Sequence, residues 1–254
     1  MNKKILISLS VIGAVAAIAI GGTIAYFSDT ETSTGNTFTA GSIDLKIDLQ
    51  TDEMNNVESF ELVDLNGRKL FEYQDVKPGD SGEMTVSGHV YNNDACGRYR
   101  IDGIVNDDNG ITEPEDEVDG IINGSDGTTD GDLDDYLMFR IWVDWGQTPG
   151  WQNATSTVDP YEGDNEYQVD YEPPVTSCGG DEWCLLSDID PNGETWDLYE
   201  MTQTYLKGST TYYTGVEWQL PWQTGNIVQS DKWGADMSFD VIQYRNNEEC
   251  VWPN

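Results

Sequence analysis

An alternation of apolar and polar residues near residue 45 restricts the fold of this chain more than any other feature. Four apolar side chains occupy every second position there: Ile43, Leu45, Ile47 and Leu49. This period of two is typical of a strand with one buried face. The period returns near the C-terminus, from Met237 to Val241. Because each strand must bury its apolar face against a second layer, the sequence predicts a sandwich of two sheets.

Further strands are expected between these two. The most apolar stretch after the N-terminal leader, YLMFRIWVDW, is rich in aromatic and β-branched residues and predicts a central strand. In the last expected strand, Ile242 and Tyr244 break the alternation, which predicts a bulge. The expected strands are Met84–Tyr91, one that begins at Tyr99, Tyr136–Trp145, Val216–Trp222 and Met237–Tyr244.

Asn66-Gly67 predicts a hairpin inserted after the first strand. The dipeptide separates two short apolar segments, Phe60–Val63 and Lys69–Glu72. Asn-Gly between two such segments is the strongest short hairpin signal that a sequence offers, because both residues tolerate a positive φ.

Two short segments favour a helix. Thr195–Leu206 carries apolar residues at helical spacing. Glu113–Val118 can form one turn with its acidic side chains at the favourable N-terminal end. The fold expected from all these patterns is all-β, a jelly-roll-like antiparallel β-sandwich with one or two short helices. It spans residues 42–254 and carries acidic loop insertions near 50–76, 106–135 and 146–193.

The first 25 residues have the pattern of a secretory signal peptide. Lys3 and Lys4 precede an almost unbroken apolar run over residues 5–20, and Thr23 and Ala25 place small residues at a cleavage site. The sequence therefore predicts a mature chain that begins at Tyr26. A retained membrane anchor is the alternative, because the apolar run approaches spanning length.

The charge of the chain excludes several classes of partner. Twelve Lys and Arg residues face 47 Asp and Glu residues, which gives a formal net charge of −35. Nucleic acid and anionic lipid are poor partners for such a chain, so contact with a membrane is expected only during export. The self-repulsion points to a salty medium, to bound divalent cations, or to both.

Four cysteines in an exported chain predict two disulfides. Cys178 and Cys184 are six residues apart and can close a small loop, which leaves Cys96 and Cys250 as the second pair. Three connectivities are open to four cysteines. A zinc centre is disfavoured, because His89 is the only histidine in the sequence.

Acidic and amide side chains crowd between residues 106 and 135. Oxygen ligands at this density suit calcium, which takes six to eight of them. No complete EF-hand template occurs, and an acidic loop solvated by salt is the alternative. The candidate calcium ligands are Asp107, Asn109, Glu113, Asp126, Asp130 and Asp132.

The sequence offers no recognisable catalytic motif. It lacks a nucleophile elbow, a phosphate-binding loop and paired histidines. The expected protein is therefore not an enzyme, and calcium is the only cofactor suggested. Asn123 and Asn153 begin N-x-[ST] tripeptides on expected loops, which is weak support for glycosylation.

Five segments resemble the TasA/camelysin family of exported proteins, which are matured by a SipW-type signal peptidase. They are Tyr26-Phe27-Ser28-Asp29, the run from Asn36 to Gly41, the alternating run from Ser42 to Ile47, Lys77-Pro78-Gly79-Asp80 with the strand after it, and the last strand, Met237–Tyr244. The resemblance implies the subunit of an extracellular filament or pilus in a biofilm-like matrix. A monomeric cell-surface adhesin and a camelysin-like metallopeptidase are the alternatives.

The resemblance also implies how such subunits would assemble. Residues 26–41 are polar and β-prone, and they can act as a donor strand that pairs with an open sheet edge of a neighbouring subunit. The partner would then be a second copy of the chain, joined head to tail, and the alternative is a frayed terminus. The donor-strand residues are Tyr26, Phe27, Ser28, Thr30, Thr32, Thr34 and Phe38.

Overall fold

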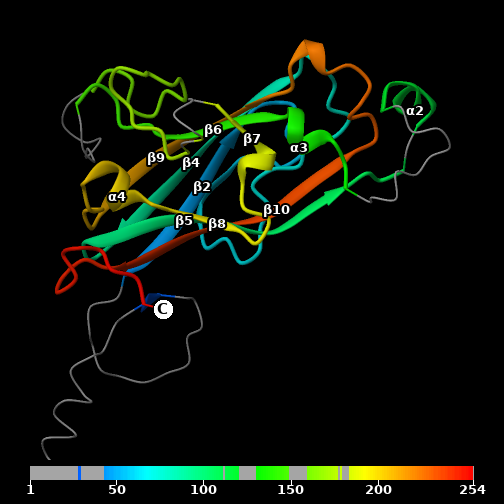
Figure 1. Cartoon of the computed structure of the whole chain (residues 1–254). Helices are drawn as coiled ribbons and strands as arrows, with labels where there is room; N and C mark the ends of the chain where they lie inside the picture. Colours follow the sequence, from blue (N-terminus) through cyan, green and yellow to red (C-terminus); the bar gives the residue numbers. More distant parts are fainter. Residues whose placement is uncertain are drawn as a thin grey trace, which may run out of the picture.

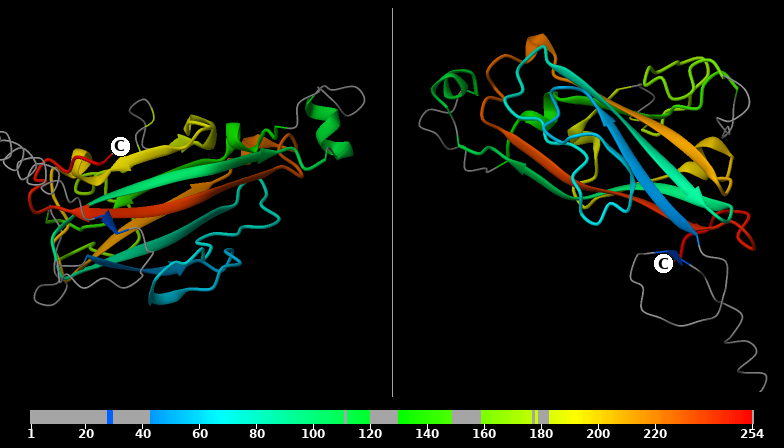
Figure 2. Two further views of the ribbon diagram at one scale, coloured as in Figure 1. Left: turned by 90° about the horizontal axis from the view of Figure 1, so that it is seen from below. Right: turned by 180° about the vertical axis from the view of Figure 1, so that it is seen from behind.

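The computed structural model of this chain describes residues 28–29, 43–110, 112–119, 130–148, 159–176, 178 and 183–253. In these ranges the chain forms two antiparallel sheets that pack face to face, as Figures 1 and 2 show. The predicted all-β sandwich is therefore confirmed. No helix within the same ranges is long and apolar enough to cross a membrane. The predicted signal peptide, residues 1–25, lies outside them.

The first sheet has the strand order β1-β10-β5-β8. Its two long central strands, β10 and β5, run side by side over most of their length. Their bounds are Ser28–Asp29 for β1, Lys232–Gln243 for β10, Ala95–Asp107 for β5 and Glu194–Asp197 for β8.

The second sheet has the strand order β3-β2-β4-β9-β6-β7. Its β2 is the alternating strand expected from residue 43, and β6 lies within the strand expected at Tyr136–Trp145, although Tyr136 itself ends a short helix. The bounds are Phe60–Val63 for β3, Asp44–Thr51 for β2, Ser81–Tyr91 for β4, Thr210–Gln219 for β9, Met138–Val143 for β6 and Cys184–Leu185 for β7.

The core lies between the two sheets. The inward residues of β2, Ile47 and Leu49, are buried against apolar residues of the other strands. Tyr99 of β5 crosses the core, where its hydroxyl is hydrogen-bonded to that of Thr214 on β9 and its ring stacks on Phe239 of β10. Each sheet therefore contributes one face to a single apolar layer.

The chain changes sheet repeatedly, as in a jelly roll. It passes from β4 to β5, from β8 to β9 and from β9 to β10, and each step leads from one sheet to the other. Short helices lie in the connections: α2 (Glu113–Asp119), α3 (Leu133–Tyr136), η1 (Leu186–Asp188), α4 (Leu198–Thr202) and η2 (Trp222–Thr224).

The predicted hairpin at Asn66-Gly67 is wrong. The turn itself forms, with φ of 44° at Asn66 and 77° at Gly67, but β3 pairs with β2 instead of with residues 69–72. Asn55 explains the difference, because its side chain bonds the Leu70 carbonyl and the Glu72 amide. The Asn56 amide also donates to the Glu72 carbonyl. The backbone of residues 70–72 is thus bonded to Asn55 and Asn56 and not to the strand Phe60–Val63.

The predicted helix at Thr195–Leu206 is shorter than expected. Its first residues form β8 and pair with β5, and α4 begins only after Asp197, whose carboxylate accepts hydrogen bonds from the Tyr199 and Glu200 amides. The helix ends at Thr202, before Gln203 in the left-handed conformation. Asp is a strong N-cap residue, so the capping site decided where this helix begins.

The predicted bulge at Ile242 is also wrong. The register of β10 with β5 runs without interruption from Asp236 to Gln243, and the irregularity lies between Gly234 and Asp236. Val241 faces the main core, whereas Ile242 packs in a separate cluster with Cys96 and Cys250 on the outer face. The alternation breaks because both faces of the strand are covered there.

The region from Gly146 to Gly193 is more than a surface insertion. Val175 and Cys184 are completely buried, and residues 173–176 run along β6, where the Val175 amide donates to the Ile141 carbonyl. Residues 173–176 cover the outer face of β6, so this strand is buried on both faces. The structure also forms both expected disulfides, Cys96–Cys250 and Cys178–Cys184.

Candidate functional site

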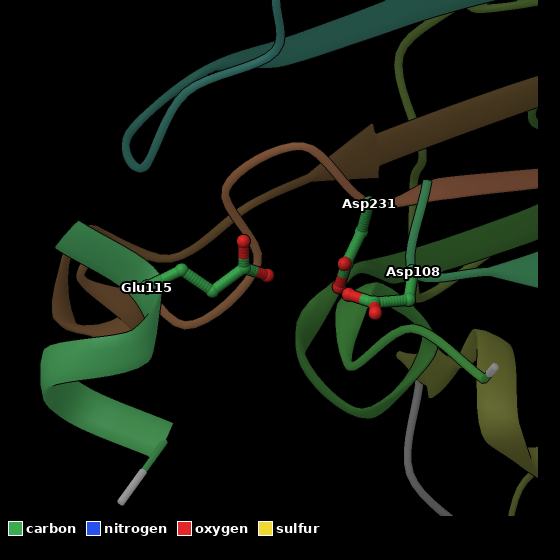
Figure 3. Close-up of side chains that lie close together, drawn as sticks. All are labelled: Asp108, Glu115 and Asp231. Carbon is green, nitrogen blue, oxygen red and sulfur yellow. The ribbon is translucent and has the colours of Figure 1, made fainter. Parts of the chain in front are cut away.

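Three carboxylates converge at one end of the sandwich. Asp108 follows β5, Glu115 lies on α2 and Asp231 precedes β10. One oxygen from each lies within 4.8 Å of the other two. Figure 3 shows the Asp108 and Asp231 carboxylates next to each other and Glu115 pointing toward them from its helix. We call these three residues the carboxylate triad.

Backbone and side-chain contacts hold the triad together. Glu115 is 2% exposed, and its Oε2 accepts from the Thr112 amide at 3.0 Å and lies 2.9 Å from the Ser230 hydroxyl. Asp231 Oδ2 accepts from the Leu133 amide at 2.9 Å. Three segments far apart in the sequence therefore fix two of the carboxylates in place.

Asp231 has the most unusual environment of the three. Its Oδ1 is buried and has no hydrogen-bond partner among the described residues. Burial, and then the nearby charge of Glu115 and Asp132, raise the pKa of Asp231 to about 7, although hydrogen bonds from the backbone of Asp132 and Leu133 oppose the shift. Neither Asp231 nor Glu115 forms an ion pair with a described Lys or Arg.

The donor set fits a hard cation. Calcium takes carboxylate oxygens at about 2.3–2.6 Å, so two oxygens that share one ion lie at most about 5 Å apart. The triad meets this spacing. It contains no imidazole or thiolate, the ligands that structural zinc prefers. A calcium ion would bind here through Asp108, Glu115 and Asp231 and would neutralise part of their charge.

The predicted calcium ligands occupy other positions. Asp107 Oδ1 accepts from the Asn109 amide, and the Asn109 side chain donates to the Ser230 carbonyl, so both hold the loop beside the triad. The negative charge of Asp132 contributes to the raised pKa of Asp231. Glu113 and Asp130 are exposed, and Asp126 lies outside the described residues.

The sequence did not single out Asp231 as a candidate ligand. It lies outside the acidic run, about 120 residues after Asp108, and its neighbours carry no metal-binding spacing. Asp108 and Glu115 do lie in the run, but nothing in the sequence separated them from the other acids there. The predicted helix at residues 113–118 is confirmed, and it is this helix that turns Glu115 inward.

A second candidate site is the free edge of β10. On the side away from β5, β10 pairs only with β1 among the described residues, through Ser28 opposite Ile242 and Asp29 opposite Val241. The rest of this edge, residues 232–240, has no strand partner in the described ranges. We call residues 232–240 the open edge.

The core is incompletely covered along the open edge. Trp233, Ala235, Met237 and Phe239 pack against the main core, but each is only partly buried. The inward residues of the central strand β4, Met84, Val86 and Val90, are at most 5% exposed. The apolar layer therefore thins at this edge of the sandwich.

Only one of the proposed donor-strand residues falls within the described structure. Ser28 pairs with the end of β10 in its own chain, close to the C-terminus, as Figure 1 shows. Six others lie outside the described residues: Tyr26, Phe27, Thr30, Thr32, Thr34 and Phe38. The sequons at Asn123 and Asn153 lie outside them as well.

Neither His89 nor any cysteine lies in the carboxylate triad. His89 lies on β4, where its Nδ1 is 2.8 Å from the Thr211 hydroxyl and its ring contacts Tyr91. The cysteines are all in disulfides, so none is available as a metal ligand. Among the described residues, the side chains whose spacing suits a metal ion are thus all carboxylates.

Comparison with known proteins gives one family. Residues 1–95 match the model of the family described as camelysin metallo-endopeptidase, and in the structure this range includes β2, β3 and β4. No curated protein matches the chain. The match covers the first 95 residues, and two disulfides are typical of an exported protein. Over its first 95 residues the chain is therefore similar to the camelysin family, which confirms the resemblance to the TasA/camelysin family that its sequence motifs predicted.

Proposed function

We propose that this protein is the subunit of an extracellular filament that assembles by strand exchange. The N-terminal segment of one subunit, residues 26–41, would pair with the open edge of the next. The observation that carries this proposal is the pairing of β1 with β10, because it joins the N-terminal segment to the same strand that forms the open edge.

The character of the open edge supports the proposal. A row of unpaired backbone donors and acceptors on an edge strand is a template for a further strand. A donor strand there would also cover the partly buried Met237 and Phe239. Its polar side chains would face outward, and Phe27 and Phe38 would supply apolar side chains at its ends.

The geometry of such a contact leads to a filament. The donor segment of one subunit and the acceptor edge of the next are different parts of the chain, so the contact is heterologous. A heterologous contact that does not close into a ring propagates without limit. In the isolated chain, the short pairing of β1 with β10 occupies only the end of the edge.

Deletion of residues 26–35 tests the proposal. The truncated protein should fold and remain monomeric under electron microscopy, while the full mature chain forms filaments. Added to growing wild-type filaments, the truncated subunit should stop their growth, because it can accept a strand but cannot donate one. Filaments of normal appearance from the truncated protein would exclude the donor-strand mechanism.

A peptidase function is the enzymatic alternative, because the matching family is described as a metallo-endopeptidase. The triad contains three carboxylates and no histidine. Purified mature protein should be incubated with unfolded peptide substrates, with and without a chelator. Cleavage that the chelator abolishes would favour the enzyme, and the filament proposal expects no cleavage.

A monomeric adhesin on the cell surface is the other alternative. It would use the same sandwich without strand exchange. Electron microscopy of the culture distinguishes the two functions, since only the filament subunit produces thin fibres that antibodies against this protein label.

We also propose that the carboxylate triad binds calcium. Besides the three converging carboxylates, the specific support is Asp231 Oδ1, which is buried without a hydrogen-bond partner in the described structure. A buried carboxylate oxygen without a partner is costly, and a cation would supply the missing partner. The ion would tie β5, α2 and β10 together at one end of the sandwich.

A further inference from the structure

Two acidic side chains lie buried beside each other at the end of β6. Asp144 is 1% exposed and Glu172 is 2% exposed, which is rare for carboxylates. A side-chain hydrogen bond between the two is among the interactions that shift their pKa values. Neither forms an ion pair with a described Lys or Arg. Their position beside β6 is well separated in sequence from the triad and from the open edge.

Backbone amides occupy all four carboxyl oxygens. Asp144 Oδ1 accepts from the Gly163 amide at 2.7 Å and Oδ2 from the Asn165 amide at 2.9 Å. Glu172 Oε1 accepts from the Gly146 amide at 3.1 Å and Oε2 from the Gln168 amide at 3.0 Å. Backbone N–H groups that point at every oxygen leave a cation no favourable approach, so this pair is not a metal site.

The pair holds one segment of the chain on the sandwich. Residues 159–176 lie beside β6, in the yellow-green part of Figure 1. Gly163, Asn165, Gln168 and Glu172 itself belong to this segment, whereas Asp144 and Gly146 continue β6. The hydrogen bonds of the two carboxyl groups therefore link the segment to the end of β6.

A hydrogen bond between two carboxyl groups requires a proton. An ionised carboxylate only accepts hydrogen bonds, so one of the two side chains must carry a hydroxyl that donates to the other. We propose that Asp144 and Glu172 share a single proton, and that loss of this proton releases residues 159–176 from β6.

The electrostatics of the site favour Glu172 as the protonated partner. Burial, and then the charge of Asp144, raise the pKa of Glu172 to about 8. The pKa of Asp144 is also raised, mainly by burial, against the effect of its hydrogen bonds.

The other titratable groups that act on Asp144 or its neighbours are acids: Asp159, Glu162 and Asp164 of the segment and Tyr213 of β9. Arg140 of β6 stacks on Tyr167 of the segment and pairs with Glu217.

The direction of the pH dependence follows from these shifts. In the closed state Glu172 keeps its proton up to a pH of about 8, whereas in the released state it ionises near its ordinary pKa of 4.5. The closed state thus binds one more proton between these values. The opening equilibrium constant should rise about tenfold for each pH unit in this window and level off above it. The attachment is therefore strongest in acid and weakest in alkali.

Hydrogen exchange of the full mature protein tests the inference. Protection factors of amides in residues 159–176, corrected for intrinsic exchange rates, should fall by about tenfold per pH unit between pH 5 and pH 8. Glu172→Gln keeps a donor toward Asp144 at every pH but loses one acceptor for the Gly146 or Gln168 amide. Its protection should therefore be lower than that of the wild type at pH 5 and independent of pH. Glu166→Gln changes an exposed acid of the same segment and should behave like the wild type.

Two outcomes would overturn the inference. The first is a pH slope in Glu172→Gln equal to that of the wild type, and the second is a wild-type segment whose protection does not change with pH. If Glu172→Gln fails to fold, carbon NMR of the wild type can measure the pKa of the Glu172 carboxyl group directly. The Glu172 carboxyl should titrate near pH 8, and titration near 4.5 would contradict the shared proton.

Discussion

Cys250 is bonded to Cys96, 154 residues before it in the sequence, with their Cα atoms 5.5 Å apart. The bond closes the C-terminal segment over the outer face of β5. Trp252 then lies on Arg98, with the guanidinium carbon 4.0 Å from the ring centroid, and its indole N–H donates to Asp197. The disulfide and the buried Ile242 form the second apolar cluster of the described structure.

Removal of this disulfide should destabilise the protein strongly. The chain-entropy model gives about 5 kcal/mol for a bridge that closes a loop of this length and about 2 kcal/mol for a six-residue loop. The double variant Cys96→Ser/Cys250→Ser should therefore lose more free energy of unfolding than Cys178→Ser/Cys184→Ser. Urea denaturation measures both losses. Equal losses would contradict a dominant effect of loop length.

Gly215 should not tolerate a side chain. A Cβ at this position of β9 would lie 2.0 Å from Cζ2 of the buried Trp142. Overpacking of this kind costs about 1–3 kcal/mol, so Gly215→Ala should lower the free energy of unfolding by that amount. Gly234→Ala is the matched control, because nothing lies within 4 Å of its added Cβ. It should change the stability by less than about 0.5 kcal/mol.

Glu115→Gln should abolish calcium binding, whereas Glu113→Gln should not. Both residues lie on α2, but Glu115 is buried in the triad and Glu113 is exposed. Isothermal titration calorimetry should show saturable binding for the wild type and for Glu113→Gln only. Calcium should also raise the melting temperature of these two proteins beyond the effect of sodium chloride at equal ionic strength. No such excess in the wild type would favour a loop that is merely solvated by salt.

Met237→Lys should block filament formation without unfolding the subunit. Met237 is partly buried on the inner face of the open edge, and an inward lysine on an edge strand opposes the addition of another strand. Electron microscopy should show no filaments, while circular dichroism reports a folded monomer. Gln223→Lys adds the same charge at an exposed position of η2 and should leave filaments intact. Filaments from Met237→Lys would place the acceptor surface elsewhere.

The mature protein should begin at Tyr26. Thr23 and Ala25 place small residues before this position, and the TasA/camelysin motif starts with it. N-terminal sequencing of secreted protein measures the start directly. Retention of residues 1–25 in a membrane fraction would favour the anchor instead.

Local patterns in the sequence were sufficient for the strands. The alternation from Ile43 to Leu49 predicted β2, and the apolar run around Ile141 predicted β6, because the period and the composition of a strand are properties of consecutive residues. The same reasoning failed at residues 69–72. There a side chain 17 residues away, that of Asn55, took the place of the expected strand partner.

Only the tertiary structure decided which acids act together. The sequence predicted a cation site within the acidic run, but Asp231 reaches Asp108 and Glu115 because β5 and β10 pair along their length, a contact between residues more than 100 positions apart. Asp144 and Glu172 likewise resemble the other 45 acids until the fold buries both of them beside each other. Burial and proximity set the charge state of a carboxyl group, and both are properties of the folded chain that no local pattern records.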